Sequence, residues 1–240
     1  MSLLEAKKIT KRFEGLLAND DVTFAIDKGE IVGLIGPNGA GKTTLFNCLT
    51  GFRKPDAGMV MFSGNNITGF APERIASMGL VRTFQITKTF TSMTVLDNVM
   101  VGALMRHADV KDALEVAREA IAFTRLGGRE GILGSSLTMA DRKRVEVARA
   151  LATGPSLLML DEAMAGLNPT EVTDAVELVR RIRDRGITVM LVEHIMEVIM
   201  PLSSRVLVMD NGALIAEGRP EEIASDPKVI RAYLGENWDA

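Results

Sequence analysis

The chain has almost no cysteine and no long apolar segment. Its one cysteine in 240 residues, Cys48, cannot form an internal disulfide, so a disulfide scaffold is excluded and a reducing compartment is favoured. No run approaches the roughly 18 apolar residues of a transmembrane helix, and the N-terminal sequence MSLLEAKKIT lacks the apolar core of a signal peptide. If the protein works at a membrane, we expect it to do so as a peripheral subunit.

An excess of basic residues is absent as well. The 28 Lys and Arg are outnumbered by 31 Asp and Glu, which gives a net charge of -3. The basic surface that binds nucleic acid is therefore not expected, and neither is a nucleic-acid partner. The length suffices for one large domain or for a domain with an inserted lobe.

Alternating apolar stretches predict an α/β fold. Strands are expected near residues 3–10, 21–26, 31–36, 59–62, 80–84, 156–161, 187–192, 205–209 and 213–217. Helical patterns cover residues 42–51, 72–78, 95–125, 141–152, 170–185 and 195–202, and turns are expected at 56–58 and 63–66. Strands that alternate with helices favour a mostly parallel sheet. The helix-rich middle interrupts this frame, so we interpret it as an inserted subdomain.

The most specific motif is a glycine-rich loop, GPNGAGKT at residues 36–43, between a predicted strand and a predicted helix. Glycines let backbone N–H groups approach phosphate oxygens, and the N-terminus of the following helix is positive. Lys42 can reach the β- and γ-phosphates, and the Thr43 hydroxyl can ligate Mg²⁺. The expected nucleotide-binding residues are Gly36, Pro37, Asn38, Gly39, Ala40, Gly41, Lys42, Thr43 and Thr44.

The second strong motif is an apolar strand that ends in two acidic residues, LLMLDE at 157–162. A carboxylate at this position can hold Mg²⁺ directly or through water, and we predict this role for Asp161. Glu162 follows immediately, where a carboxylate can contact the water in line with the γ-phosphate and polarise or position it. Alone, the pair would be interpreted as two solvated acids; with the loop upstream it predicts a hydrolytic Mg·NTP site.

Three isolated residues lie where such a site would need them. His194 follows the strand 187–192, at the end where α/β sheets bind ligands, and can hydrogen-bond the γ-phosphate. Gln85 follows the strand 80–84 and can ligate Mg²⁺, and Phe13 can stack on adenine. Each of these residues also has an interpretation without a role in nucleotide binding. His194 would be a structural histidine, Gln85 an ordinary loop residue and Phe13 an aromatic ring in the core or at its edge.

Taken in order, these residues resemble the ATP-binding cassette family of transporter ATPases, over essentially the whole chain. The matches are Phe13 with the adenine-stacking aromatic, Gly36–Thr44 with the Walker A segment, Gln85 with the Q-loop, Leu160-Asp161-Glu162 with the Walker B end and its catalytic glutamate, and His194 with the switch histidine. The resemblance implies a P-loop NTPase fold: a mostly parallel sheet, an N-terminal antiparallel β portion and an inserted helical subdomain. The nucleotide-binding core would comprise residues 1–85 and 153–240, and the helical subdomain residues 86–152.

The resemblance also implies the activity and the partners. The catalytic residues would be Lys42, Gln85, Glu162 and His194, and the Mg²⁺ ligands Thr43, Gln85 and Asp161. In this family two cassettes clamp two ATP molecules head to tail, each between one chain's phosphate loop and the partner's signature motif. Closure acts on two integral-membrane permease subunits at the cytoplasmic face of the inner membrane, hydrolysis of Mg·ATP reopens the dimer, and an importer adds a solute-binding protein.

The signature motif departs from the family pattern LSGGQ. The matching residues are Leu137, Thr138, Met139, Ala140 and Asp141, and in a later loop Asn168 replaces a common aspartate. Met139 and Ala140 place side chains where glycines allow close backbone approach, and Asp141 brings a negative charge towards an anion. Asp141 suits helix capping better than phosphate contact. Because the residues that would serve the chain's own ATP are intact, we hypothesise an asymmetric heterodimer with a second cassette.

Several stretches are similar to the ATPases of branched-chain amino-acid importers, namely residues 46–51, 79–85, 165–169, 192–194 and 233–236. We therefore expect an importer ATPase for branched-chain or other small hydrophobic amino acids, with a permease docked on about residues 86–101. The alternatives are a lipopolysaccharide or lipid exporter ATPase, and an importer ATPase for another small organic solute such as urea or an aromatic acid. No long coiled-coil arm, tandem cassette or Asn-Lys-x-Asp motif occurs in the sequence, which disfavours a DNA- or ribosome-acting ATPase and a GTPase.

Overall fold

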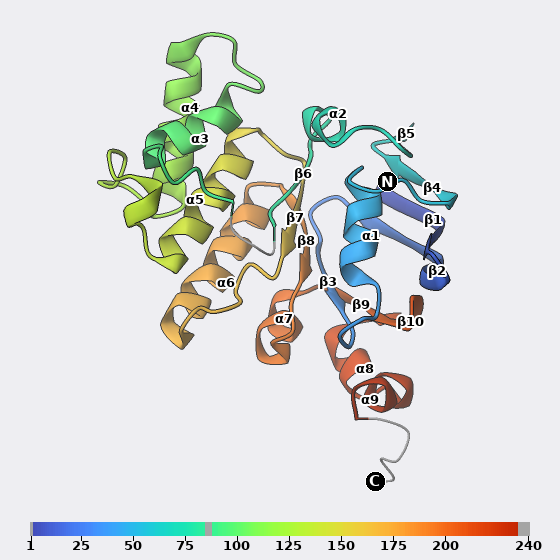
Figure 1. The fold of residues 1–240 in the computed structure, drawn as a ribbon. Helices are drawn as coiled ribbons and strands as arrows, with labels where there is room; N and C mark the ends of the chain where they lie inside the picture. Colours follow the sequence, from blue (N-terminus) through green and yellow to red (C-terminus); the bar gives the residue numbers. More distant parts are fainter. Residues whose placement is uncertain (1, 85–87, 235–240) are drawn as a thin grey trace.

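The computed structural model describes residues 2–84 and 88–234, which form two sheets and the helices around them (Figure 1). The N-terminal sheet is antiparallel, with the order β2-β1-β4-β5, and consists of β1 (Ser2–Phe13), β2 (Leu16–Asp27), β4 (Ala57–Phe62) and β5 (Asn65–Asn66). The central sheet has the order β10-β9-β3-β8-β7-β6, and consists of β3 (Ile31–Ile35), β6 (Leu80–Arg82), β7 (Leu157–Asp161), β8 (Thr188–Val192), β9 (Arg205–Asp210) and β10 (Ala213–Gly218). Its strands run parallel except for β10, so the predicted fold class is confirmed.

The central sheet is covered on both faces. Every residue of β3, β7 and β8 is buried, which explains why these strands are continuous apolar runs. One face packs with the antiparallel sheet and α1 (Lys42–Leu49), where Phe46 and Leu4 are fully buried. The other face packs with the later helices, which are α6 (Pro169–Asp184), α7 (Met196–Leu202), α8 (Pro220–Ala224) and α9 (Pro227–Leu234). The short α2 (Pro72–Ser77) precedes β6.

The middle of the chain forms a helical lobe beside the sheets, at the upper left of Figure 1. It contains α3 (Val95–Ala103), α4 (Val110–Phe123), the 3-10 helix η1 (Gly134–Ser136) and α5 (Met139–Ala152). These helices enclose an apolar cluster of their own, which includes Val99 and Val145. Gly102 allows α3 to meet α5 closely, because a Cβ at this position would lie 2.1 Å from the Arg149 carbonyl oxygen.

Tertiary pairing moves several boundaries away from the sequence prediction. β1 and β2 extend to a tight turn in which Glu14 has φ +50°, so they are longer than the predicted strands. The turns predicted at 56–58 and 63–66 are partly wrong, because Ala57 starts β4 and Asn65–Asn66 pair with that strand as β5. The helical pattern of residues 95–125 is broken before Asp109, whose side chain caps α4 by accepting a hydrogen bond from the Lys111 N–H at 2.7 Å.

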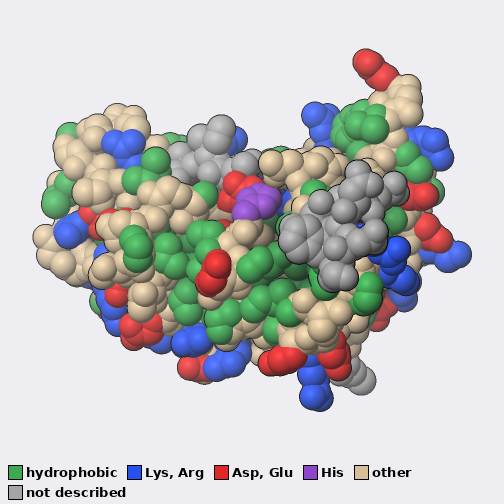
Figure 2. Space-filling model, turned by 90° about the horizontal axis from the view of Figure 1, so that it is seen from below, with side chains coloured by type: hydrophobic (Ala, Val, Ile, Leu, Met, Phe, Trp, Pro, Cys, Tyr) green, Lys and Arg blue, Asp and Glu red, His purple; other side chains and the backbone are tan. Residues whose placement is uncertain are grey.

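One face of the molecule combines charged side chains with hydrophobic ones. Figure 2 shows a histidine in contact with an acidic side chain in the middle of one face, next to many hydrophobic side chains. Within the described residues, none of the helices is long and apolar enough to cross a lipid bilayer.

Candidate nucleotide-binding site

The phosphate loop connects β3 to α1 and fits tightly against its neighbours. Gly36 has φ +148° and Gly41 has φ +99°. A Cβ on Gly36 would lie 2.1 Å from the Met209 carbonyl oxygen, and one on Gly41 would lie 2.2 Å from the Ala18 carbonyl oxygen. The glycines are therefore required both by the backbone angles and by the close approach of β2 and β9.

We expect Gly41→Ala to weaken ATP binding at least about tenfold, a loss of about 1.4 kcal/mol. The added methyl group cannot fit against the Ala18 carbonyl oxygen, so the loop and the start of α1 must move. Titration with a fluorescent ATP analogue measures the affinity. Gly127→Ala is the matched control, because no heavy atom lies within 4 Å of its added Cβ. Equal affinities of the two variants would contradict the prediction.

Lys42 lies over the loop. Its ammonium donates hydrogen bonds to the Gly36 and Pro37 carbonyl oxygens at 2.6 and 2.9 Å. Burial lowers the pKa of Lys42, and the carboxylates of Glu162 and Asp161 oppose this shift. A lysine ammonium has three N–H donors, so one remains for a phosphate oxygen.

A pocket of ≈ 620 Å³ opens beside this loop, within the size range of small-molecule sites. Its lining joins the antiparallel sheet, the loop and the ends of central strands, and includes Phe13, Leu16, Leu17, Ala18, Asn38, Gly39, Ala40, Gly41, Lys42, Thr43, Thr44, Glu162, His194 and Asn211. The structure thus brings together residues that the sequence separates by more than 180 positions. Phe13 is 39% exposed, with its ring available at the pocket wall. Gln85, the predicted metal ligand, lies outside the described residues.

Asp161 ends β7 below the loop and is 1% exposed. Its Oδ2 accepts a hydrogen bond from Arg82 Nη2 at 2.7 Å in a buried ion pair. Burial raises the pKa of Asp161, and the Arg82 guanidinium opposes this shift. Its Oδ1 is buried and has no hydrogen-bond partner among the described residues. An unpaired buried carboxylate oxygen fits a divalent cation, since Mg²⁺ commonly takes one or two carboxylates together with substrate phosphates.

Glu162 stands in an uncommon backbone conformation at the pocket. Its φ is +49°, a region that non-glycine residues rarely adopt and that often occurs at functional sites. The His194 Nε2 lies 2.6 Å from Glu162 Oε1, and the Glu162 N–H donates to the Val192 carbonyl oxygen at 3.0 Å. The imidazole therefore fixes a carboxylate that can accept a proton from a water molecule in the pocket.

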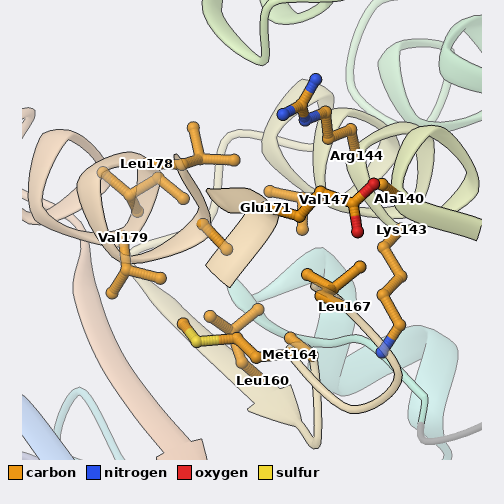
Figure 3. A pocket seen from close by; sticks show the side chains of 13 residues that line it. Ala140, Lys143, Arg144, Val147, Leu160, Met164, Leu167, Glu171, Leu178 and Val179 are labelled. Atoms are coloured by element: carbon orange, nitrogen blue, oxygen red, sulfur yellow. The ribbon is translucent and has the colours of Figure 1, made fainter. Parts of the chain in front are cut away.

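A second pocket lies between α5, α6 and β7 (Figure 3) and is unsuited to a nucleotide. It holds only ≈ 40 Å³ and is lined mainly by apolar side chains such as Leu160, Leu167 and Val147. The larger pocket at the phosphate loop is therefore the candidate site.

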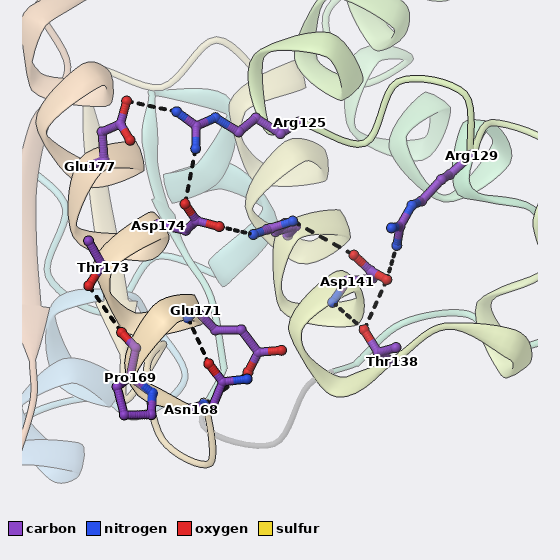
Figure 4. A network of polar contacts seen from close by, with 11 residues as sticks. Arg125, Arg129, Thr138, Asp141, Asn168, Pro169, Glu171, Thr173, Asp174 and Glu177 are labelled. Atoms are coloured by element: carbon purple, nitrogen blue, oxygen red, sulfur yellow. Dashed lines mark hydrogen bonds and ion pairs between the residues drawn. The ribbon is translucent and has the colours of Figure 1, made fainter.

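The signature segment forms the start of α5 (Figure 4). Thr138 caps the helix, since its Oγ1 accepts from the Asp141 N–H at 3.2 Å and donates to Asp141 Oδ2 at 2.9 Å. Asp141 is 5% exposed and also pairs with Arg129. The flanking Met139 is 57% exposed. The Thr138 hydroxyl is thus engaged in a cap, and Asn168 likewise caps α6 by accepting from the Glu171 N–H at 3.0 Å.

Three site residues were missed by sequence reasoning. Arg82 pairs with Asp161, and Lys143 donates to the Glu162 carbonyl oxygen at 3.0 Å. The fully buried Asn19 donates from Nδ2 to the Gly41 carbonyl oxygen at 3.1 Å. Arg82 could have been found from the sequence, because a basic residue in a short buried strand requires a partner. Nothing in the sequence around Lys143 or Asn19 indicates the contacts that they make.

Comparison with known proteins places the chain in a family. A family profile described as "ABC transporter" matches residues 19–165, and one described as "Branched-chain amino acid ATP-binding cassette transporter" matches residues 213–239. The chain is 39% identical over 254 residues to the high-affinity branched-chain amino acid transport ATP-binding protein BraF of Pseudomonas aeruginosa, with 98% of each chain covered. It is 41% identical over 253 residues to the corresponding protein LivG of Escherichia coli K12, again with 98% of each covered.

Solved structures agree with this assignment. A nucleotide-free ATP-binding cassette from an ABC transporter has a TM-score of 0.90 at 33% identity, and covers 98% of this chain and 100% of its own. A cassette of an ABC transporter in its ADP conformation has a TM-score of 0.89 at 34% identity with the same coverage. The chain therefore belongs to the ABC transporter family and is one of its ATP-hydrolysing cassettes.

Proposed function

We propose that this protein is the ATP-hydrolysing subunit of an importer for branched-chain amino acids. The observation that carries the proposal is the convergence of the phosphate loop and the Glu162–His194 pair on one pocket. Asp161, directly before Glu162, is buried and has one oxygen without a hydrogen-bond partner among the described residues. The substrate class is supported by the names of the relatives BraF and LivG and by the match over residues 213–239.

In the proposed site, each side chain acts through a contact that the geometry allows. Phe13 stacks on adenine, while the loop N–H groups and Lys42 hold the phosphates. Asp161 and the Thr43 hydroxyl would hold Mg²⁺, which would neutralise charge on the phosphates. Glu162 orients the attacking water and accepts its proton, and His194 keeps the Glu162 carboxylate facing the pocket. The role of Gln85 as a further metal ligand stays a prediction.

We further propose that the working dimer pairs this chain with a different cassette. Each ATP would lie between one phosphate loop and the other chain's signature segment. Here that segment offers Met139 and Ala140 in place of glycines, and its Thr138 hydroxyl is engaged by Asp141. This segment would serve the partner's ATP poorly, whereas a complete signature from a second cassette would serve this chain's own ATP well.

The membrane partners would be two permease subunits and a solute-binding protein, with the cassette on the cytoplasmic face of the inner membrane. We place permease docking on the described part of residues 86–101. Phe90 is 45% exposed there, and Val101 is 44% exposed. Exposed apolar side chains of this kind suit an apolar contact with another protein.

The proposal is tested by uptake in a strain that lacks this chain. Expression of the wild-type chain should restore uptake of radiolabelled leucine, whereas Lys42→Ala should not, because the phosphates lose their cation. Urea and benzoate are measured in parallel as the alternative substrate classes. Restored uptake of urea or benzoate without leucine would overturn the proposed substrate.

A further inference from the structure

Lys143 reaches from the helical lobe to the catalytic end of β7. Its side chain extends from α5 towards the loop after β7 (Figure 3), and its Nζ donates to the Glu162 carbonyl oxygen at 3.0 Å. This bond joins the helix that begins with the signature segment to the residue that faces the γ-phosphate in the proposed site. The acceptor of this hydrogen bond is the main-chain carbonyl group of Glu162. The Glu162 carboxylate is therefore still in contact with His194.

Two buried carboxylates act on the charge of the Lys143 ammonium. Burial lowers the pKa of Lys143, while Glu193, Glu146 and Glu162 oppose the shift. Glu193 and Glu146 are only 3% and 5% exposed. Carboxylates are rarely so buried without a partner, and each of these two accepts a hydrogen bond from a backbone N–H group.

The same group fixes backbone on both sides of β7. Glu146, one turn after Lys143 on α5, accepts from the Phe84 N–H at 3.0 Å at the end of β6. Glu193, next to His194, accepts from the Met164 N–H at 2.8 Å in the loop that follows Glu162. The helix α5 therefore contacts the chain at the end of β6 through Glu146 and directly after β7 through Lys143.

Glu162 needs such support because of its backbone conformation. A glutamate with φ +49° is strained, and strained residues persist only where their surroundings hold them. The Val192 carbonyl oxygen holds its N–H, and Lys143 holds its carbonyl oxygen. Removing the Lys143 ammonium would therefore free the peptide group between Glu162 and Ala163 from its hydrogen bond.

We propose that Lys143 is a positioning residue for Glu162, and that it makes the orientation of this carboxylate depend on the placement of α5. The inference rests on the proposed role of Glu162. The helix starts at the signature segment, and Lys143 lies four residues after Met139, which is about 6 Å along the axis. A signature segment displaced by the partner's nucleotide would thereby move the support of this chain's own catalytic glutamate.

The test compares Lys143→Met, Lys143→Arg and the control Lys111→Met, an exposed lysine of α4, in the assembled transporter. We expect Lys143→Met to lower kcat about 10- to 100-fold, since small misplacements of a catalytic group have effects of this size, with KM for ATP changed less than about threefold. Lys143→Arg should recover most of kcat because it keeps a donor, and the control should match the wild type. If Lys143→Met does not fold, Lys143→Ala replaces it, since alanine also removes the donor to the Glu162 carbonyl oxygen.

A double variant separates positioning from a general structural role. Adding Lys143→Met to Glu162→Gln should cause no further loss in single-turnover hydrolysis, because both changes act through one carboxylate. A full additional loss, or a rise in KM without a fall in kcat, would overturn the inference. If Glu162→Gln itself retains wild-type activity, the proposed role of Glu162 fails instead.

Discussion

The Glu162→Gln variant is expected to hydrolyse ATP at least about 100-fold more slowly than the wild type, while its ATP affinity changes little. Glutamine keeps the shape of the side chain and can still contact His194, but it cannot accept a proton from the attacking water. Phosphate release from the purified transporter measures kcat, and a fluorescent ATP analogue measures affinity. Glu221→Gln, on the surface of α8, is the matched control and should behave as the wild type.

The same substitution tests the asymmetry of the proposed dimer. Glu162→Gln in this chain inactivates the ATP site that we expect to contain a complete signature segment from the partner. The equivalent substitution in the partner cassette inactivates the ATP site that faces Met139, Ala140 and Asp141 of this chain. The first change should therefore abolish most of the ATPase activity of the transporter and the second much less. Equal losses would argue against two unequal sites.

The local parts of the candidate site could be proposed from the sequence because each is a short segment with its own chemistry, and their roles stay predictions. The phosphate loop follows directly from glycine spacing and Lys42, and the acidic pair follows from an apolar strand that ends in two carboxylates. The two motifs lie close together because the sheet is parallel and β3, β7 and β8 present their carboxyl ends on the same edge. For this reason the fold class and the main site residues were predicted together.

The supporting contacts could not be predicted, because they depend on side chains that meet across long sequence separations. Arg82 and Asp161 are 79 positions apart, and Lys143 meets the carbonyl group of Glu162 rather than its side chain. A main-chain acceptor has no sequence signature. The predicted strand boundaries were partly wrong for a related reason. Asn65 and Asn66 pair with β4, and this pairing overrides the preference of asparagine for turns.

Arg82 is the strongest example of a hidden supporting residue. It is 6% exposed in its side chain, and its two terminal nitrogens donate to Asp161 Oδ2 and Asn47 Oδ1, both at 2.7 Å. Its guanidinium carbon lies 5.0 Å from the ring centre of Phe84 and 5.5 Å from that of Phe52. The planar fork and the aromatic contacts suit arginine and no other side chain. Arg82 thus binds one oxygen of Asp161, while the other has no hydrogen-bond partner among the described residues.

Replacing Arg82 by Met should lower the free energy of unfolding by about 3–5 kcal/mol, because Asp161 is left as an uncompensated charge in the core. Urea denaturation of the isolated chain without nucleotide or Mg²⁺ measures the loss. The exposed Arg118→Met should change stability by less than about 0.5 kcal/mol. The double variant Arg82→Met/Asp161→Asn should be more stable than Arg82→Met alone, since the buried charge is gone even though the metal ligand is lost. If the double variant is no more stable than Arg82→Met alone, the unpaired Asp161 charge does not cause the loss, and Arg82 acts only through its packing.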